Sequence, residues 1–209
     1  MNLAQIWEAA KMKGSQAYPT SLRSVVALAN NKSQFKLPIL ADQSVVASGF
    51  ESRLNPSDGF QVTHIGLRWI NATAATIDEG PLFTNENSTE ADAAADIGAI
   101  YGGGLTFQVN TLVNAEWKTD IFRSVPTAQG GAVTAAITGP TTYTTPLDGV
   151  GPGAGFVAAY PMDIYLDGSK KNEFTVNLAS GKADIEPDSN TNYLVLDLRG
   201  YYVVNGSTK

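Results

Sequence analysis

The chain has 209 residues, of which 43% are hydrophobic and 16% are charged, with 14 Lys and Arg against 20 Asp and Glu and a net charge of −6. This length suffices for one large β domain with a real core. The acidic balance disfavours binding to nucleic acid, which needs clustered cations, and no sequence-specific nucleic-acid recognition is expected. The chain has no Cys and one His, which excludes disulfides, thiolate chemistry and Cys-based zinc sites.

The first residues do not resemble a signal peptide. Glu8, Lys11 and Lys13 interrupt the apolar residues at this end of the chain. No run approaches the roughly 20 apolar residues of a membrane helix. We therefore expect a protein made in the cytoplasm and not exported by the usual route.

Residues 1–36 are predicted to form a short N-terminal helical arm. The spacing i, i+3, i+4, i+7 of one apolar helical stripe is met by Leu3, Ile6, Trp7 and Ala10. Residues 21–29 repeat this spacing, although Val25 and Val26 fit a strand equally well. A helix of about twelve residues is marginal alone in water, so the arm should dock on a neighbouring subunit, on a lipid surface or on its own domain.

The longest strand pattern lies between Gly102 and Pro126. Apolar residues alternate with polar ones from Leu105 to Val113, and a second run follows from Trp117 to Ile121. A period of two is typical of strands with one buried face. We expect this stretch to form the centre of an antiparallel sheet.

A second strong strand, residues 60–71, changes phase along its length. Phe60 and Val62 share one face, whereas Ile65, Leu67 and Trp69 fall on the other. A one-residue slip would expose the apolar set. The pattern therefore predicts a β-bulge near residues 63–64.

The rest of the β region is predicted from Leu37 onward. A strand is expected in 156–166, a hairpin loop at Asp167–Gly168 leads into a strand over 173–179, and the last strand spans 193–204. Short strands are further expected in 45–50 and 132–138. In the last strand the inward residues should be Leu194, Leu196 and Leu198, with Tyr193, Val195, Asp197 and Arg199 pointing outward.

About eight strands with long, uneven connections favour an all-β fold, a jelly-roll-type antiparallel β-sandwich. An immunoglobulin-like sandwich is the second candidate. The predicted organisation is the arm, 1–36, followed by a single domain, 37–209. An insertion around 72–101, rich in Ala and acidic residues, is expected to carry a short helix over 88–99.

No constellation of residues predicts an enzyme, a cofactor site or a metal site. His64 has no partner suggested by the sequence for nucleophilic or acid–base catalysis. Residues 184–190 place oxygen ligands at alternate positions, but Ser189 replaces the Gly and Val195 replaces the Glu of a calcium loop. No pair of carboxylates is singled out among Glu116, Asp120, Asp163 and Glu173.

Aromatic residues are the more informative group. Six tyrosines are expected to be exposed at strand ends or in loops, namely Tyr101, Tyr143, Tyr160, Tyr165, Tyr201 and Tyr202. Flat aromatic rings bind sugars, pack in protein interfaces or simply cover the rim of a core. The sequence does not separate these three roles.

Three segments together resemble structural proteins of bacterial viruses. They are LNPSDGFQVTHIGLRWI, YGGGLTFQVNTLVNAEWKTDIF and NYLVLDLRGYYV, preceded by the helical arm. The chain is similar in style, over residues 40–204, to jelly-roll coat subunits of tailless icosahedral phages. This resemblance implies a virion subunit that oligomerises and contacts other virion proteins, with a lipid layer as a further contact.

The main hypothesis is thus a non-enzymatic, capsid-type subunit assembling through sheet edges, loops and its arm. The residues expected at the interface are Leu3, Ile6, Trp7, Phe83 and Tyr101. The alternative is a carbohydrate-binding module or phage adhesin head that uses the exposed tyrosines.

Overall fold

The computed structural model describes residues 16–39, 54–73, 82, 96–123, 156–158, 164–178, 180–182, 185 and 191–207. These residues are all-β, with two short 3-10 helices, η1 (Ile97–Gly102) and η2 (Thr119–Phe122). The strands are β1 (Ala17–Ala27), β2 (Gln34–Ile39), β3 (Gly59–Ala72), β4 (Gly104–Val109), β5 (Leu112–Lys118), β6 (Phe156–Ala158), β7 (Tyr165–Asp167), β8 (Asn172–Asn177) and β9 (Thr191–Val203).

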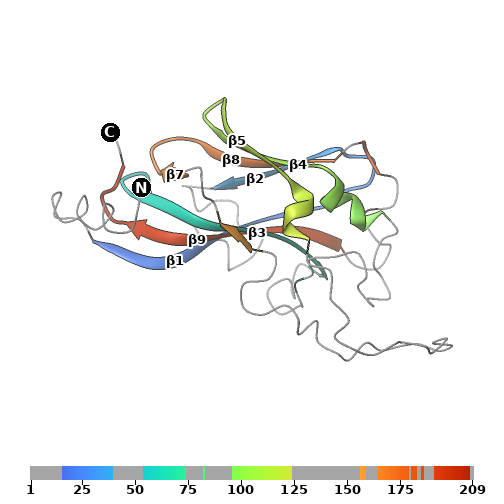
Figure 1. Cartoon of the computed structure of the whole chain (residues 1–209), viewed down its shortest axis with the longest axis horizontal. Coiled ribbons are helices and arrows are strands. Elements are labelled where there is room, and N and C mark those ends of the chain that lie inside the picture. The colour runs from blue at the N-terminus through green and yellow to red at the C-terminus, as the bar shows by residue number, and fades with distance from the viewer. Residues whose placement is uncertain are drawn as a thin grey trace.

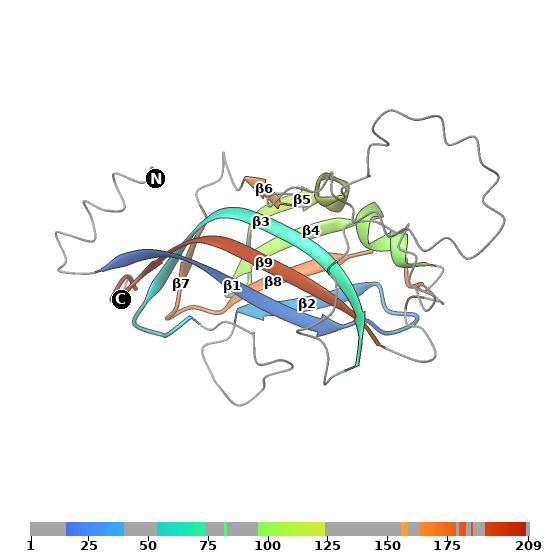
Figure 2. The same ribbon diagram turned by 90° about the horizontal axis from the view of Figure 1, so that it is seen from below.

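The strands form two antiparallel sheets that face each other (Figure 1). The five-stranded sheet has the order β1-β9-β3-β6, and β7 also pairs with β3. The four-stranded sheet has the order β2-β8-β4-β5. Figure 2 shows that the long strands β1, β9 and β3 curve over the four-stranded sheet.

The core lies between the sheets. Each inward side chain that leaves water contributes roughly 1.5–3 kcal/mol to the hydrophobic term of folding. Trp69 and Leu196 supply buried side chains from the five-stranded sheet. Phe107 and Phe174 on the opposite sheet stack with ring centroids 4.7 Å apart. The apolar side chains that alternate along the strands of both sheets thus pack into one core between them.

The predicted bulge in β3 is confirmed. The pairing of β3 with β9 shifts register between Val62 and His64. Phe60, Val62, Ile65, Leu67 and Trp69 consequently all belong to the core cluster between the sheets. The extra residue, Thr63, absorbs the change of phase that the sequence carries.

The prediction for Gly102–Pro126 is right about strands, and its central position in the sheet is right for β4 but wrong for β5. Asn110 adopts a left-handed conformation with φ of 58° and breaks the run into the hairpin β4–β5. Asn tolerates this conformation better than most residues. β4 lies inside its sheet, between β8 and β5, whereas β5 lies at the end of the sheet, so only the first part of the stretch is central.

The prediction of a helical arm is wrong for residues 17–36, the part of the arm in which the structure describes strands. Ala17–Ala27 form β1, which pairs along its whole length with β9, and β2 begins at Gln34. The β region therefore starts about twenty residues before Leu37. The strand alternative for Val25 and Val26 is correct, because side-chain alternation against β9 outweighs a weak helical periodicity. Residues 1–15 lie outside the described residues.

The C-terminal half needs two corrections. β7 and β8 lie in different sheets, so the loop after Asp167 crosses the sandwich instead of closing a hairpin. The inward positions of Leu194, Leu196 and Leu198 in β9 are confirmed, but the outer face of β9 is also largely buried. Tyr193 and Val195 form a second apolar cluster with Val25 and Ile70, against which Leu82 packs.

Several predictions fall on residues outside the described part of the chain. They are the strands in 45–50 and 132–138, most of the helix predicted for 88–99, and the acidic loop 184–190 apart from Ile185. These stay predictions.

Candidate functional site

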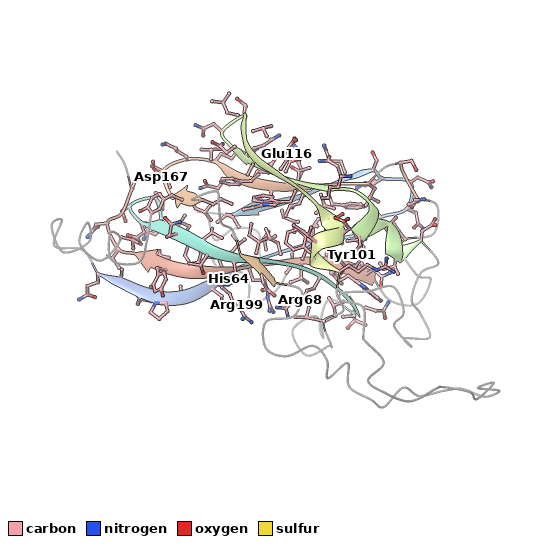
Figure 3. All side chains as sticks on the ribbon, in the orientation of Figure 1. His64, Arg68, Tyr101, Glu116, Asp167 and Arg199 are labelled. Atoms are coloured by element: carbon pink, nitrogen blue, oxygen red, sulfur yellow. The ribbon has the colours of Figure 1, made fainter. Side chains whose placement is uncertain are left out.

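The outer face of the five-stranded sheet gathers an unusual set of cations. Cross-strand pairing aligns Arg23 with Asp197, and places Arg199 between Ser21 and His64. Arg68 lies on the same face of β3, one row beyond Asp197. Three of the five arginines and the only His thus share this face in a chain of net charge −6. Figure 3 shows His64, Arg68 and Arg199 together on the side of the sheet that faces away from the other sheet.

Asp197 is the acidic residue at the centre of this face. Its carboxylate accepts hydrogen bonds from Arg23 Nε at 2.6 Å and Arg23 Nη2 at 3.2 Å. Arg68 Nη2 lies 3.5 Å from the second carboxylate oxygen. Burial lowers the pKa of Arg68; the charge of Asp197 opposes this shift and the neighbouring Arg23 and Arg199 add to it. Within this group of described side chains, three guanidinium groups thus surround or neighbour one carboxylate.

The bulge turns two consecutive side chains toward Arg199. Thr63 Oγ1 donates to the carbonyl oxygen of Arg199 at 2.9 Å, and His64 Nδ1 lies 3.1 Å from the same hydroxyl. Because this hydroxyl donates its proton to the carbonyl, the contact with His64 is satisfied when Nδ1 carries a hydrogen. The His64 side chain is exposed beside Arg199.

A shallow hollow opens next to these residues. Its volume is about 440 Å³, and it is lined by Pro19, Thr20, Ser21, Thr63, Arg199, Gly200 and Tyr201. The side chains of Pro19, Ser21, Arg199 and Tyr201 lie on this face of the sheet with Thr63, whereas the Thr20 side chain alternates to the other face with Leu22. None of these seven described residues is acidic.

A second feature is the free edge of the four-stranded sheet. Among the described residues, no strand pairs with the outer side of β5. Leu112 and Val113 at the tip of the β4–β5 hairpin are 73% and 53% exposed, and Ile121 just after β5 is 44% exposed. Glu116 and Lys118 are also exposed along β5. Exposed apolar groups beside an open strand edge are typical of a contact surface.

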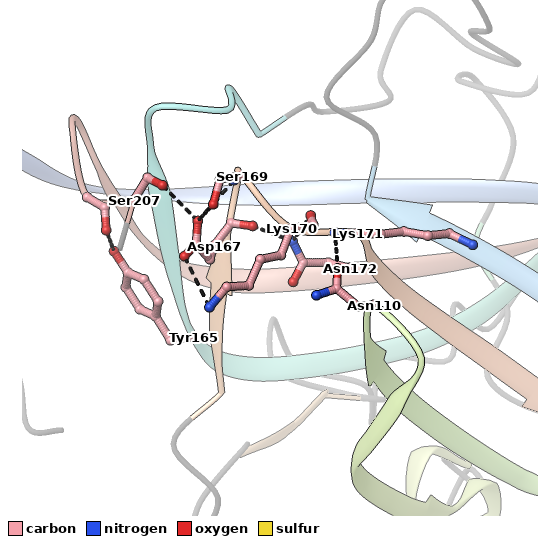
Figure 4. A network of polar contacts seen from close by, with 9 residues as sticks. Asn110, Tyr165, Asp167, Ser169, Lys170, Lys171, Asn172 and Ser207 are labelled. Atoms are coloured by element: carbon pink, nitrogen blue, oxygen red, sulfur yellow. Dashed lines mark hydrogen bonds and ion pairs between the residues drawn. The ribbon is translucent and has the colours of Figure 1, made fainter. Parts of the chain in front are cut away.

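The end of the five-stranded sheet at which β7 pairs with β3 carries a polar network (Figure 4). Asp167 Oδ1 accepts hydrogen bonds from the backbone and hydroxyl of Ser169 at 2.9 and 2.7 Å and from Ser207 Oγ at 2.9 Å. Asp58 accepts from Tyr202 at 2.7 Å and from the Asn205 backbone at 2.8 Å. Because donors already surround both carboxylates, we interpret this network as a tie between the C-terminal segment and two loops.

The two tyrosines of this network are not free platforms. Burial, reinforced by the charges of Asp167 and Asp58, raises the pKa of Tyr165 to about 12, and its hydroxyl donates to the Gly206 carbonyl at 2.7 Å. Tyr202 stacks on Tyr18, with ring centroids 5.4 Å apart. Tyr18, which is 46% exposed on β1, was not among the predicted tyrosines, because it falls within the predicted helical arm, 1–36.

Tyr101 corrects the list of exposed tyrosines and of interface residues. Its side chain is 3% exposed, belongs to the core cluster and donates to the Leu67 carbonyl at 3.4 Å. Burial raises its pKa, opposed by the charge of Arg68. The prediction that Tyr101 is exposed is wrong, because η1 turns the ring into the sandwich. Leu3, Ile6, Trp7 and Phe83 lie outside the described residues, as do Tyr143 and Tyr160.

The carboxylates singled out by sequence do not converge. Glu116 is exposed on β5, and Asp120 is exposed in η2. Glu173 on β8 forms ion pairs with Lys36 at 3.2 Å and Lys171 at 3.0 Å. Burial opposes ionisation of Glu173, but its bonds to the two lysines more than offset this and hold its pKa below the usual value. In the part of the chain that the structure describes, no three His, Asp or Glu side chains are grouped as metal ligands.

Comparisons with known proteins return no family model, no curated protein and no solved structure that matches this chain. None of the helices among the described residues is long and apolar enough to cross a membrane.

Proposed function

We propose that this protein is a non-enzymatic, capsid-type jelly-roll subunit of a virion that assembles with copies of itself. The observation that carries the proposal is the nested order of strand pairing. β1 pairs with β9, β2 with β8, β3 with β6 and β7, and β4 with β5. The strands of the first half of the chain therefore pair, in reverse order, with the strands of the second half.

This nesting supports a jelly roll over an immunoglobulin-like sandwich. A long double ribbon of this kind closes into two sheets when it folds across itself, and the additional pairs β9–β3 and β8–β4 are the contacts that this folding requires. Consecutive strands then alternate between the sheets, except within the hairpin β4–β5 and the pair β6 and β7, as in the double Greek key of jelly rolls. Viral capsid domains are one large class that uses this architecture.

The edge of β5 supports self-association. Two copies of β5 related by a two-fold axis at Trp117 would place Glu116 of one copy opposite Lys118 of the other. The same axis brings Val113 of one copy toward the segment that carries Ile121 of its mate. Such a contact is self-complementary in charge and in apolar surface, as an isologous interface must be.

The experiment is size-exclusion chromatography with light scattering on the full chain across a range of concentrations. We expect an oligomer that the variant Leu112→Lys/Val113→Lys reduces to a smaller species. The matched control, Thr111→Lys/Asn114→Lys, adds the same charge to exposed positions of the same hairpin. A wild-type chain that remains monomeric at high concentration contradicts the proposal, and an oligomer that survives in both variants excludes the β5 edge as its contact.

A further inference from the structure

We propose that Asn205 is a site of spontaneous covalent modification, at which loss of the side-chain amide releases the C-terminal segment from the loops that it ties. Residues 204–207, which form this tie, are called the clasp. The pair Asn205-Gly206 is the one Asn-Gly pair in the sequence. The clasp binds Asp58 and Asp167 and takes no part in the β5 edge, so the inference does not rest on the assembly proposed above.

The chemistry belongs to the Asn-Gly pair itself. The backbone nitrogen of Gly206 attacks the side-chain carbon Cγ of Asn205, so that a Cγ–N bond forms and the Cγ–Nδ2 bond breaks. The proton of the Gly206 amide goes to the departing nitrogen, which leaves as ammonia. Water then opens the resulting succinimide ring at either carbonyl, which leaves aspartate or isoaspartate. Asparagine is a thermolabile residue, and glycine crowds the ring least because it has no side chain.

The fold itself requires this labile pair in the turn after β9. Asn205 has a φ of 54°, in the left-handed region that Asn and Gly adopt most readily. A Cβ on Gly206 would lie 2.5 Å from the hydroxyl oxygen of Tyr165 and 2.9 Å from Cβ of Val203. Packing thus excludes a side chain at position 206, and backbone conformation restricts position 205.

The closed clasp holds the pair in an unreactive arrangement. The attacking nitrogen belongs to a buried residue, and its N–H donates to the Val203 carbonyl at 3.1 Å. The Asn205 amide donates to Asp58 Oδ1 at 2.8 Å, and the Tyr165 hydroxyl donates to the Gly206 carbonyl at 2.7 Å. These bonds fix the backbone on both sides of the exposed Asn205 side chain. The attack therefore requires a local opening of the clasp.

The product cannot close the clasp in the same way. Isoaspartate adds one carbon to the main chain between the amide of residue 205, which binds Asp58, and the carbonyl of Gly206, which binds Tyr165. Aspartate and isoaspartate both also place a new carboxylate close to that of Asp58, and like charges repel. Because ammonia is lost, the reaction turns a transient opening into a permanent one.

The test is incubation of the full chain at mildly alkaline pH, followed by peptide mapping with mass spectrometry. We expect aspartate and isoaspartate at residue 205. Asn31 and Asn110 are internal controls, because they share the left-handed conformation but precede Lys32 and Thr111, and they should stay intact.

Two comparisons test the need for opening. The free peptide of residues 201–209 should react about tenfold faster than the folded chain. Tyr165→Phe removes one bond of the clasp and should bring the folded chain toward the rate of the peptide. Tyr201→Phe, which removes a hydroxyl outside the clasp, is the matched control and should react like the wild type.

Hydrogen exchange and urea unfolding test the consequence. After modification, the amides of residues 204–207 should exchange about tenfold faster, and the chain should be less stable. Asn205→Asp, which carries the new charge on a normal backbone, should show part of this loss. Asn205→Gly keeps access to the left-handed conformation without an amide to lose, so it should remain unmodified and stable.

Three results would contradict the proposal. A folded chain that reacts as fast as the free peptide would overturn the need for opening. Unchanged exchange at 204–207 in the modified chain would overturn the release of the clasp. An intact residue 205 in both the wild type and Tyr165→Phe, under conditions in which the peptide reacts, would overturn the site altogether.

Discussion

At the scale of single residues, the three consecutive glycines at the start of β4 differ in whether a side chain would fit. Close packing requires glycine at one position but not at its neighbour. A Cβ on Gly103 would overlap the carbonyl oxygen of Asn177 on β8, whereas a Cβ on Gly102 would meet no atom within 4 Å. Gly103 also binds Thr119 through its amide, which donates to the hydroxyl at 3.0 Å. The sequence gives no sign of a difference among the three glycines; only the packing shows which of them has no room for a side chain.

We therefore expect Gly103→Ala to lower the free energy of unfolding by about 3 kcal/mol or more, because the backbone of β4 must move away from β8. Gly102→Ala should change it by less than about 1 kcal/mol. Chemical denaturation of the two variants measures the difference. Equal stabilities would contradict the close approach of Gly103 to β8.

Two tyrosines make the stability of the fold sensitive to alkaline pH. Burial, followed by the hydrogen bond to Asp58, raises the pKa of Tyr202 to about 12, and burial raises that of Tyr165 to about 12. In the unfolded chain both phenols ionise near pH 10. Their contribution is thus fully present below pH 10 and is lost as the pH rises toward 12.

We expect the free energy of unfolding to fall between pH 10 and 12 by about 1 kcal/mol for each of the two rings, after allowance for solvent screening. Tyr202→Phe should be less stable than the wild type at pH 8 but should lose less on going to alkaline pH. Tyr201→Phe, one residue away and on the other face of β9, is the control. Identical pH profiles for wild type and Tyr202→Phe would count against the assignment.

At the scale of elements, the bulge in β3 reconciles two halves of a strand that are out of phase. Deletion of Thr63 removes the extra residue, so Val62, Ile65 and Leu67 would keep their inward positions in a regular strand. Deletion of Gly66 shifts the phase where no bulge can absorb it, and Leu67 and Trp69 would turn outward.

We accordingly expect the Thr63 deletion to remain folded, with a loss of about 1–2 kcal/mol for the missing bond to Arg199. The Gly66 deletion should not fold cooperatively. Circular dichroism and thermal unfolding of both chains distinguish these results. A Thr63 deletion that unfolds as completely as the Gly66 deletion would argue that the bulge does more than correct the phase.

The element scale also shows what the sequence could predict. The β3 bulge and the inward face of β9 were predictable, because a buried face enforces strict alternation of apolar side chains. β1 was missed because its apolar spacing also fits a helix and its partner, β9, lies at the other end of the chain. The hollow was missed because it joins Ser21, Thr63 and Arg199, which only strand pairing brings together.

At the scale of the whole molecule, the last strand of the chain is an interior strand of its sheet. β9 pairs with β1 on one side and with β3 on the other, and Ala17 meets Val203 across almost the full length of the sequence. Leu194, Leu196 and Leu198 from this strand fill the middle of the core. The five-stranded sheet therefore cannot form until the final strand is available, and such non-local pairing folds slowly.

A chain that ends at residue 190 should consequently be unfolded as a whole, since both β1 and β3 lose β9 as their pairing partner. A chain that ends at Val203 keeps β9 and loses only the bonds made by residues 204–207, among them those to Asp58, Asp167 and Tyr165, at a cost of about 3 kcal/mol. Hydrogen exchange and urea unfolding of the two truncations test this contrast. A cooperative transition in the shorter chain would contradict the central role of β9. If the shorter chain shows no cooperative transition, the sheet edge proposed for assembly forms only when β9 is present. Chains that lack β9 would then be unable to join the oligomer.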